Sequence, residues 1–572
     1  MTPTNEDTLL RVENLRVAFG DRRAPTEVVK GVSFSLAAGR CLAIVGESGS
    51  GKSVTARTLV GLTGGRSHVT AERLELAGRD LRGLRDREWR RLRGRDVGFV
   101  LQDALVSLDQ LRPVGKEIAE ALRLHGWGTR AERRDRVIDL LGQVGIPEPA
   151  LRARQLPHEL SGGQRQRALI ASAIALDPKL IIADEPTTAL DVTVQARILR
   201  LLEDIRERGS TLILISHDLA VVARMADEVA VMRDGEIVEY GDAREVLQDP
   251  RHEYTRALLD AIPTTHSKGT RLSPRTAHAH APASAATTTP AATGARFVRA
   301  GADRVPVLEV QDVVKRYTGP DGISRTVVDR VSFAVNAGET LGLVGESGSG
   351  KTTSARIALA LTEPEEGRVL LNGEPWSGLP EKQRRARRGQ ISVIYQDPLS
   401  SFDPRWSVGR ILADSLPAGA YSDARARQAR VSQLLEQVGL AEDHRERRPL
   451  QLSGGQRQRV AIARALGPEP SIIVCDEPVS ALDVSIQAQV LDLLCDLQRE
   501  LGVSYLFISH DLGVIHHMSD RVLVLNEGKV VETGDADAVF RAPQEPYTQR
   551  LLAALPRLER RQADLEPVHA AV

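Results

Sequence analysis

The 572-residue chain contains the same series of motifs twice. Three motifs recur in the same order in the second half: GESGSGKS (46–53) as GESGSGKT (345–352), LSGGQRQR (160–167) unchanged at 452–459, and ISHDL (215–219) at 508–512. The two copies of each motif lie 292 to 299 residues apart. Solenoid repeats have periods of roughly 20–50 residues, so this much longer spacing indicates duplication of a whole domain. We therefore expect two similar folded units rather than one large core.

Residues 264–304 separate the two halves and are rich in Thr, Ala, Pro and Ser, without apolar periodicity. This composition is typical of a flexible linker. The charged segment after Pro556 also shows no apolar periodicity. We therefore predict a first domain at 8–263, a linker at 264–304, a second domain at 305–558 and a tail at 559–572.

Each half alternates short runs rich in Val, Ile and Leu with helical stretches. Continuous apolar runs between helices are typical of parallel strands that are buried on both faces. The runs are 41–46, 180–184, 211–216 and 229–233 in the first half, and 340–345, 471–476, 503–509 and 521–526 in the second. The predicted fold class is α/β.

The composition limits the kinds of partner that the chain can have. Lys and Arg total 76 and Asp and Glu total 76, so no net charge attracts nucleic acid or anionic lipid. The N-terminus lacks the basic and apolar regions of a signal peptide, and no uninterrupted apolar run approaches the roughly 20 residues that cross a bilayer. We expect a cytoplasmic protein that binds no nucleic acid.

Both glycine-rich stretches follow an apolar run and precede a helical stretch, the context of a phosphate-binding G-x-x-x-x-G-K-[ST] loop. Gly46, Gly49 and Gly51 let the backbone curl so that N–H groups point at phosphate oxygens. Lys52 is expected to reach the β- and γ-phosphates of ATP, and the Ser53 hydroxyl to bind Mg²⁺. The complete predicted loops are Gly46, Glu47, Ser48, Gly49, Ser50, Gly51, Lys52 and Ser53, and Gly345, Glu346, Ser347, Gly348, Ser349, Gly350, Lys351 and Thr352.

In each half a buried apolar run ends in adjacent carboxylates, in LIIADEP and IIVCDEP. Asp184 and Asp476 suit the coordination shell of Mg²⁺. Glu185 and Glu477 suit the group that orients or deprotonates an attacking water. Because these pairs follow a phosphate loop at matching spacing in both halves, they predict two ATP-hydrolysing sites.

LSGGQRQR lies between the phosphate loop and the Asp-Glu pair in both halves, and it resembles the signature motif of ATP-binding cassette (ABC) proteins. The resemblance covers about residues 8–263 and 305–558. It implies a P-loop NTPase (RecA-like) core with a small antiparallel β-subdomain and a helical signature subdomain, duplicated in tandem. It also implies that the two cassettes dimerise within the chain, each nucleotide lying between one phosphate loop and the signature of the other half.

Several further residues take their roles from this resemblance. The signatures Ser161, Gly162 and Gly163, and Ser453, Gly454 and Gly455, open a helix whose N–H groups and dipole can meet the γ-phosphate. The resemblance assigns Gln102 and Gln396 to Mg²⁺ and to the surface that faces the permease, His217 and His510 to the γ-phosphate as catalytic residues, Asp191 and Asp483 to the loop that crosses the dimer interface, and Phe19 and Tyr317 to stacking on adenine.

A finer resemblance concerns the kind of transporter. EPTTALDVTVQARIL and EPVSALDVSIQAQVL resemble the D-type and F-type ATPases of dipeptide and oligopeptide permeases, as do the closing YTRALLDAIP and YTQRLLAALP. The order suggests a fusion of two normally separate subunits. The first Q-loop, QDALVSLDQLRPVG, departs from the pattern because it lacks prolines at the positions of Pro398 and Pro404. The cysteine-rich ending of many D-type subunits is also missing.

The resemblance thus implies an ATPase that couples ATP hydrolysis, with Mg²⁺, to import of peptides or related solutes. It implies two transmembrane permease subunits and an extracytoplasmic substrate-binding protein as partners, and a peripheral location at the cytoplasmic face of the cell membrane. Dipeptides, oligopeptides, glutathione and nickel complexes all remain open, because the solute never touches a cassette.

A soluble twin-cassette ATPase without a permease is the alternative. ABC-F translation factors carry a long charged helical arm between their cassettes, which residues 264–304 cannot form. Excision-repair ATPases carry zinc-binding cysteine clusters, whereas the three cysteines here are widely separated. A twin-cassette exporter ATPase shares the same chemistry and is disfavoured by the resemblance alone.

Overall fold

The computed structural model describes residues 8–21, 25–102, 107–188, 190–263, 269–273, 305–318, 322, 324–417, 419–421 and 423–555. Within these residues the chain forms two compact units, the first ending at Leu259 and the second running from Asp260 to Leu555. Each unit contains one antiparallel and one mainly parallel sheet with helices, so the predicted α/β class is confirmed.

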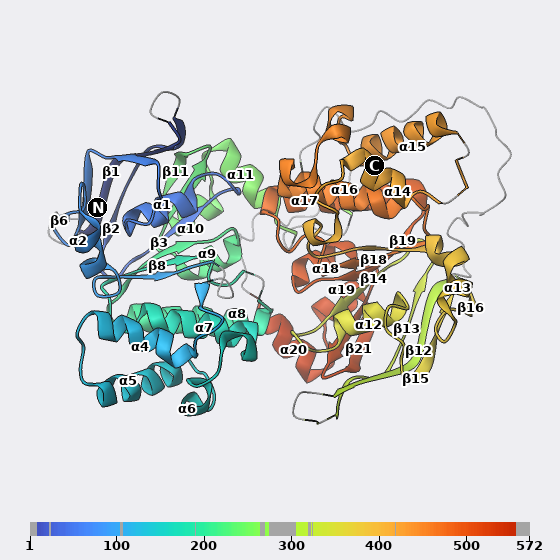
Figure 1. The fold of residues 1–572 in the computed structure, drawn as a ribbon, viewed down its shortest axis with the longest axis horizontal. Helices are drawn as coiled ribbons and strands as arrows, with labels where there is room; N and C mark the ends of the chain where they lie inside the picture. Colours follow the sequence, from blue (N-terminus) through green and yellow to red (C-terminus); the bar gives the residue numbers. More distant parts are fainter. Residues whose placement is uncertain are drawn as a thin grey trace, which may run out of the picture. The chain divides into compact units, whose positions relative to one another are not determined.

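The first unit is built on two sheets (Figure 1). Its strands are β1 (Thr8–Phe19), β2 (Thr26–Ala37), β3 (Cys41–Val45), β4 (Ser67–Thr70), β5 (Arg73–Leu76), β6 (Arg79–Asp80), β7 (Val97–Val100), β8 (Leu180–Asp184), β9 (Thr211–Ile215), β10 (Glu228–Arg233) and β11 (Glu236–Asp242). The antiparallel sheet has the order β2-β1-β5-β6, with β4 also paired to β1. The larger sheet has the order β11-β10-β3-β9-β8-β7; β11 pairs antiparallel with β10, and the other neighbours are parallel.

Helices α4, α5 and α6 of the first unit lie together on the side away from the antiparallel sheet (Figure 1). The helices are α1 (Lys52–Leu59), α2 (Asp86–Leu92), α4 (Val114–Leu124), α5 (Arg130–Gln143), α6 (Pro149–Arg152), α7 (Gly162–Ala173), α8 (Val192–Glu207), α9 (Leu219–Met225), α10 (Ala243–Gln248) and α11 (Glu253–Asp260). Because the signature opens α7, the helical subdomain that the family resemblance implies is present.

The second unit repeats this architecture. Its strands are β12 (Pro306–Thr318), β13 (Ser324–Asn336), β14 (Thr340–Val344), β15 (Glu366–Leu371), β16 (Glu374–Pro375), β17 (Ile391–Ile394), β18 (Ile472–Asp476), β19 (Ser504–Ile508), β20 (Arg521–Asn526) and β21 (Lys529–Asp535). Its helices are α12 (Lys351–Ala358), α13 (Glu381–Arg384), α14 (Val408–Ser415), α15 (Ala424–Gln437), α16 (Gly454–Leu466), α17 (Val484–Leu501), α18 (Leu512–Met518), α19 (Ala536–Arg541) and α20 (Pro546–Ala553). The sheet orders are β13-β12-β15-β16 and β17-β18-β19-β14-β20-β21.

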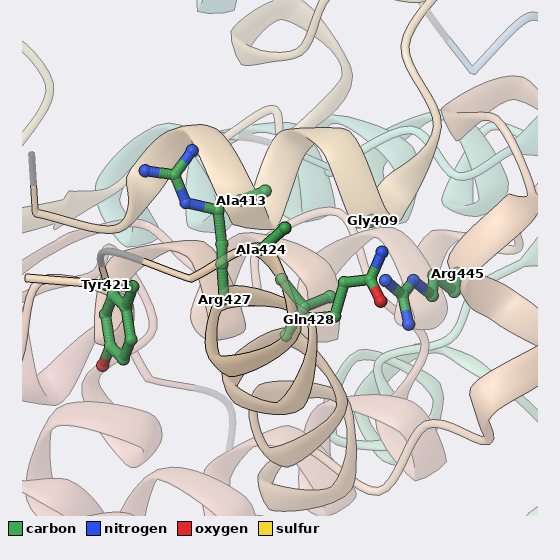
Figure 2. Close-up of a pocket in the computed structure, with 8 residues that line it drawn as sticks. Gly409, Ala413, Tyr421, Ala424, Arg427, Gln428 and Arg445 are labelled. Carbon is green, nitrogen blue, oxygen red and sulfur yellow. The ribbon is translucent and has the colours of Figure 1, made fainter.

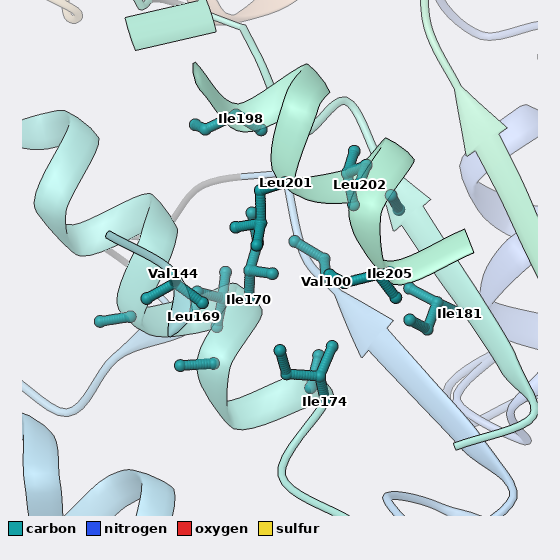
Figure 3. Packing of buried hydrophobic residues seen from close by; sticks show 14 of the residues in the cluster. Val100, Val144, Leu169, Ile170, Ile174, Ile181, Ile198, Leu201, Leu202 and Ile205 are labelled. Carbon is teal, nitrogen blue, oxygen red and sulfur yellow. The ribbon is translucent and has the colours of Figure 1, made fainter. Parts of the chain in front are cut away.

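The apolar runs identified in the sequence form the central strands of both larger sheets. Every residue of β3, β8 and β9 is buried, as in β14 and β19 of the second unit. In the first unit, one face of the sheet packs on α7 and α8 in the cluster drawn in Figure 3, and the other face packs on the antiparallel sheet. Burial on both faces explains why these strands are apolar at every position.

None of the helices in the described ranges is both long and apolar enough to span a bilayer.

One part of the predicted linker, residues 269–273, packs against the second unit. The backbone N–H groups of Leu272 and Ser273 donate to the two carboxylate oxygens of Asp492 in α17, at 3.0 and 2.8 Å. Arg271 forms an ion pair with Asp496 one turn further along, at 3.1 Å. Leu272 and Asp492 are 3% and 4% exposed. This segment thus makes core contacts within the range for which the sequence predicts a flexible linker.

The composition of the segment conceals this contact, because two of its hydrogen bonds come from backbone N–H groups, which almost every residue has. The second compact unit runs from Asp260 to Leu555, and the bounds given above for the two domains, the linker and the tail stay predictions. The remainder of the predicted linker and the tail at 559–572 lie outside the described residues.

We expect Asp492→Ala to lower the free energy of unfolding of the second unit by about 1–3 kcal/mol, because it leaves one buried and one half-buried N–H group without an acceptor. Chemical denaturation measures the loss, and trypsin cleavage after Arg271 reports release of the segment. Asp496→Ala is the matched control on the same helix; it removes a half-exposed ion pair worth at most about 1 kcal/mol. Equal stability of both variants would contradict the anchoring role of Asp492.

Candidate functional site

The first glycine-rich stretch forms a loop between β3 and α1, and the second forms the same loop between β14 and α12. Gly46 has φ 144°, and a Cβ atom there would lie 2.1 Å from the carbonyl oxygen of Met232. Gly345 has φ 151°, and its Cβ would lie 2.2 Å from the carbonyl oxygen of Leu525. Any side chain at these two positions would force the loop away from the adjacent strand, so glycine is required there.

The lysine of each loop is buried with its ammonium group inside the curl of the backbone. Lys52 Nζ donates to the carbonyl oxygens of Gly46 and Glu47, both at 2.7 Å. Lys351 Nζ donates in the same way to Gly345 at 2.7 Å and to the following residue at 2.8 Å. The ammonium group of each lysine is therefore held beside the N-terminus of a helix, and its contact with the β- and γ-phosphates stays a prediction.

Asp184, at the end of β8, lies beside the first loop. The Ser53 hydroxyl donates to Asp184 Oδ1 at 3.0 Å, whereas Oδ2 is buried and makes no hydrogen bond within the described ranges. Burial raises the pKa of Asp184 above its ordinary value, although the hydrogen bond from Ser53 opposes the shift. Hydroxyl and carboxylate oxygens are the ligands that Mg²⁺ prefers, so this pair fits the ion, with Oδ2 free to bind it.

The second unit places Asp476 at the end of β18, with Thr352 in the first turn of α12. Burial raises the pKa of Asp476, and the neighbouring charge of Glu477 raises it further. A nearby divalent cation would stabilise the ionised form of either aspartate, which is consistent with the predicted role in Mg²⁺ binding.

Glu185 follows Asp184, and three side chains contact one oxygen of its carboxylate. Its Oε2 accepts hydrogen bonds from Gln102 Nε2 at 2.8 Å and from Thr188 Oγ1 at 3.0 Å. The Nδ1 atom of His217 lies 3.4 Å from the same oxygen. The structure thus brings the predicted water-orienting Glu185 into contact with Gln102 and His217.

Glu477 repeats this arrangement with Gln396 Nε2 at 3.0 Å and His510 Nδ1 at 3.2 Å from its Oε2. Burial alone would raise the pKa of each glutamate, but the hydrogen bond and positive charge of its histidine lower the pKa below the usual range. Burial would likewise lower the pKa of His217 and His510, but the glutamates raise it. Each glutamate is therefore held ionised, as a hydrogen-bond acceptor for water must be.

Both glutamates adopt a backbone conformation that non-glycine residues rarely occupy. Glu185 has φ 49° and Glu477 has φ 52°. Their backbone N–H groups donate to Ile215 at 2.9 Å and to Ile508 at 3.0 Å, across to the adjacent strand. Such a conformation costs on the order of 1–3 kcal/mol and persists where the surrounding structure imposes it. Its occurrence at the same position in both units indicates that the carboxylate direction is imposed by the sheet.

The signature residues begin α7 and α16, as the sequence predicts. Ser161 caps α7 by accepting the Gln164 N–H at 3.3 Å, and Ser453 caps α16 by accepting the Gln456 N–H at 3.2 Å. Glycine is needed next to the cap, because a Cβ at Gly163 would lie 2.5 Å from Val194, and a Cβ at Gly455 would lie 2.5 Å from Ile486. These two glycines thus let each signature helix pack closely on the helix that follows, α8 or α17.

Asp191 and Asp483, which the resemblance assigns to the dimer-crossing loop, also have a local role. Each caps the helix that follows it, α8 or α17, by accepting a backbone N–H group, at 2.9 Å from Val194 and at 3.1 Å from Ile486. Asp at an N-cap is typical of a helix start. These two residues therefore set where each of the two long helices begins.

The two proposed adenine platforms differ from each other. Phe19, at the end of β1, is half-buried and packs against the core of the first unit. Tyr317, near the end of β12, is 44% exposed, with the ammonium of Lys315 5.5 Å from its ring centre. Tyr317 is open to a stacking partner, whereas Phe19 has a structural role as well. Stacking on adenine stays a prediction for both.

Sequence reasoning missed several residues of the site. Thr188 donates to the carboxylate of Glu185 at 3.0 Å, and Ser480 at the matching position donates to the Glu477 carbonyl oxygen at 3.2 Å. A hydroxyl three residues after the glutamate in both EPTT and EPVS is the signal that could have identified them.

A surface pocket between α14 and α15 of the second unit is separate from these residues (Figure 2). It is lined by Gly409, Ala413, Tyr421, Ala424, Arg427, Gln428, Val431 and Arg445. The Arg445 guanidinium forms an ion pair with Glu442 at 3.0 Å. None of the predicted site residues lines this pocket, so it is no part of the phosphate site.

A parallel sheet in which one strand runs into a phosphate-binding loop, and another ends in an Asp-Glu pair, places the chain among the P-loop nucleoside triphosphatases. The profile of one family of this class, described as "ABC transporter", matches residues 29–188 and 328–480, more than half of the chain. The chain therefore belongs to the ABC transporter family, as an ATP-binding protein with two cassettes in tandem. ATP-binding proteins of this family hydrolyse ATP to drive transport.

A second profile, "Oligopeptide/dipeptide transporter, C-terminal region", matches residues 238–298 and 531–572. The chain is 43% identical over 564 residues to the glutathione import ATP-binding protein GsiA of Shigella dysenteriae serotype 1 (strain Sd197), and equally to that of Escherichia coli (strain K12). Each alignment covers 96% of this chain and 90% of the relative. A dimeric structure of the ATP-binding cassette MJ0796 in a post-hydrolysis state, bound to ADP and Pi, is 29% identical, with a TM-score of 0.37, and covers 40% of this chain and 98% of that one.

Proposed function

We propose that this chain is the ATP-hydrolysing subunit of an ABC importer for peptides or related solutes, with glutathione as the first solute to test. The observation that carries the proposal is the likeness to glutathione import ATP-binding proteins over 96% of the chain. The match of both C-terminal regions to the oligopeptide/dipeptide transporter profile supports the same solute class.

Both sites carry a complete set of residues for hydrolysis. In the first unit Lys52 and the loop N–H groups bind the phosphates, and Glu185 orients the attacking water while His217 holds its carboxylate. When bound, Mg²⁺ neutralises phosphate charge, and Ser53 and Asp184 would hold it. The second unit offers the equivalent set, so we expect both sites to turn over ATP.

The relatives are import ATP-binding proteins, and import through a membrane requires partners that cross it. We propose two transmembrane permease subunits, an extracytoplasmic substrate-binding protein and a peripheral location at the cytoplasmic face of the cell membrane. The Q-loop glutamines touch the catalytic glutamates at 2.8 and 3.0 Å. A permease that moved a Q-loop would thereby move a glutamine bound to the catalytic carboxylate.

We also propose, from the family resemblance, that the two cassettes pair within the chain so that each signature completes the site of the other half. What supports this pairing is that each unit supplies one phosphate loop and one capped signature helix. A helix N-terminus with small residues can approach a γ-phosphate closely and stabilise its charge.

Reconstitution tests the transport function. The full chain is co-expressed with the two permeases and the binding protein of the same organism, and the complex is placed in proteoliposomes. We expect ATP-dependent uptake of labelled glutathione or of a di- or tripeptide, and faster ATP hydrolysis when the loaded binding protein is added. Uptake should require the catalytic glutamates and should be lost with Glu185→Gln plus Glu477→Gln.

Glu207→Gln plus Glu500→Gln is the matched control, because both residues are exposed near the C-terminal ends of α8 and α17. These substitutions should leave uptake unchanged. If the chain failed to associate with any permease and hydrolysed ATP alone, the transport proposal would be wrong. Outward movement of the solute would refute import in particular.

A further inference from the structure

The C-terminal helix of each cassette brings a tyrosine hydroxyl to the phosphate loop. The backbone N–H of Glu47 donates to Tyr254 Oη of α11 at 3.0 Å, and the N–H of Glu346 donates to Tyr547 Oη of α20 at 3.0 Å. The two tyrosines are 6% and 8% exposed. The same contact occurs in both units although their surrounding sequences differ. It is therefore a shared feature of the two cassettes.

This contact and the lysine contact act on one peptide group. The N–H of Glu47 and the C=O of Gly46 belong to the same planar peptide, and the Gly46 oxygen accepts from Lys52 Nζ at 2.7 Å. In the second unit the Gly345 oxygen accepts from Lys351 Nζ at 2.7 Å. The tyrosine therefore holds one edge of the peptide while the lysine holds the other, and rotation of the peptide would break both bonds.

The helix that carries each tyrosine is anchored at its start by a carboxylate on β11 or β21. Glu239 of β11 accepts the backbone N–H groups of Arg251 and His252, just before α11, at 2.7 and 3.2 Å. Glu532 of β21 accepts the corresponding N–H groups before α20, at 2.8 and 3.3 Å. Both glutamates fix the start of the helix, and hence the direction in which its tyrosine points.

The ring of Tyr254 has a further neighbour: the Arg233 guanidinium lies 5.0 Å from its centre. Arg233 ends β10, directly after Met232, whose carbonyl oxygen faces Gly46. Tyrosine, loop and strand end therefore form one packed group around the first peptide of the phosphate loop.

We propose that Tyr254 and Tyr547 are positioning residues for ATP binding, which keep the first peptide of each phosphate loop, and through it the lysine, in the phosphate-accepting arrangement. The C-terminal region shared with peptide transporters would then form part of the nucleotide site. The proposal depends on ATP hydrolysis and not on the transported solute.

The test is Tyr254→Phe plus Tyr547→Phe in the full chain, with steady-state hydrolysis measured against ATP concentration. We expect KM for ATP to rise about tenfold while kcat changes less than about twofold, because a half-buried N–H loses its acceptor in a loop that binds phosphate equally in the ground and transition states. Direct binding of ATP, measured with both catalytic glutamates changed to glutamine, should weaken by the same factor.

Tyr505→Phe is the matched control: its hydroxyl is also fully buried but donates to the Leu494 carbonyl oxygen, away from either loop. It should lower stability without moving KM. Both chains are assayed below their unfolding transitions, so a loss of stability cannot imitate the effect. An unchanged KM and ATP affinity in the double Tyr→Phe chain, or an equal change with Tyr505→Phe, would overturn the proposal.

Discussion

In a chain that carries Glu185→Gln and Glu477→Gln, we expect ATP to bind normally and steady-state hydrolysis to fall at least about a hundredfold, the loss typical of removing a general base. The glutamine side chain keeps the shape of the carboxylate but cannot take up a proton or hold a water as strongly. Phosphate release measures the hydrolysis, and binding of a fluorescent ATP analogue measures the affinity.

The structure makes this substitution conservative at the first site. The Glu185 carboxylate accepts from Gln102, Thr188 and the histidine through one oxygen, Oε2, and a glutamine retains one such oxygen. The exposed pair Glu207→Gln and Glu500→Gln carries the same chemical change on α8 and α17 and should leave the rate unaltered. An undiminished rate in the Glu185 and Glu477 double variant would show that another group activates water.

The second large effect is expected in a chain with one working phosphate loop. With Lys351→Ala inactivating the second loop, Ser453→Arg should abolish the remaining hydrolysis, whereas Ser161→Arg should spare most of it. The reason is the proposed pairing, in which Lys52 works with the signature of the other half. Loss of a helix N-terminus at the γ-phosphate should cost on the order of 1 kcal/mol or more, and arginine adds a steric block.

The two signature variants are controls for each other. Ser161 and Ser453 cap their helices with the same reciprocal hydrogen bonds, to Gln164 and Gln456, so either substitution removes an equivalent cap. If the substitutions acted only by destabilising their helices, they would reduce ATP hydrolysis equally. The proposed pairing instead predicts that they reduce it unequally. If Ser161 proved essential and Ser453 dispensable, each cassette would work alone.

Much of the phosphate site could be predicted from the sequence because its chemistry is local. The glycines, Lys52 and Ser53 lie within one short stretch, and the positive φ values that require glycine belong to that stretch. The apolar runs that became β3, β8, β9 and β10 were equally visible, since burial on both faces demands apolar residues throughout. Each motif also recurs in the second half of the chain, which made an accidental match less plausible.

The contacts around those motifs could not be predicted in the same way. Glu47 and Tyr254 are 207 residues apart, and the bond between them uses a backbone N–H, which carries no sequence signal. The docking of Leu272 on Asp492 spans 220 residues and has the same physical basis. An aspartate inside a helix otherwise looks like an ordinary solvated charge.

The sequence was enough to infer a duplicated ATP-binding cassette protein, and to predict which residues bind phosphate and activate water. These properties follow from spacing along the chain, because a phosphate loop needs only a strand, a curl of glycines and a helix. Two features could be seen only in the folded structure. Thr188 and His217 both contact one oxygen of Glu185, and the last helix of each cassette contacts the phosphate loop. Contacts of this kind depend on the order of the strands in the sheet, which is set by hydrogen bonds and packing between segments that are distant in the sequence.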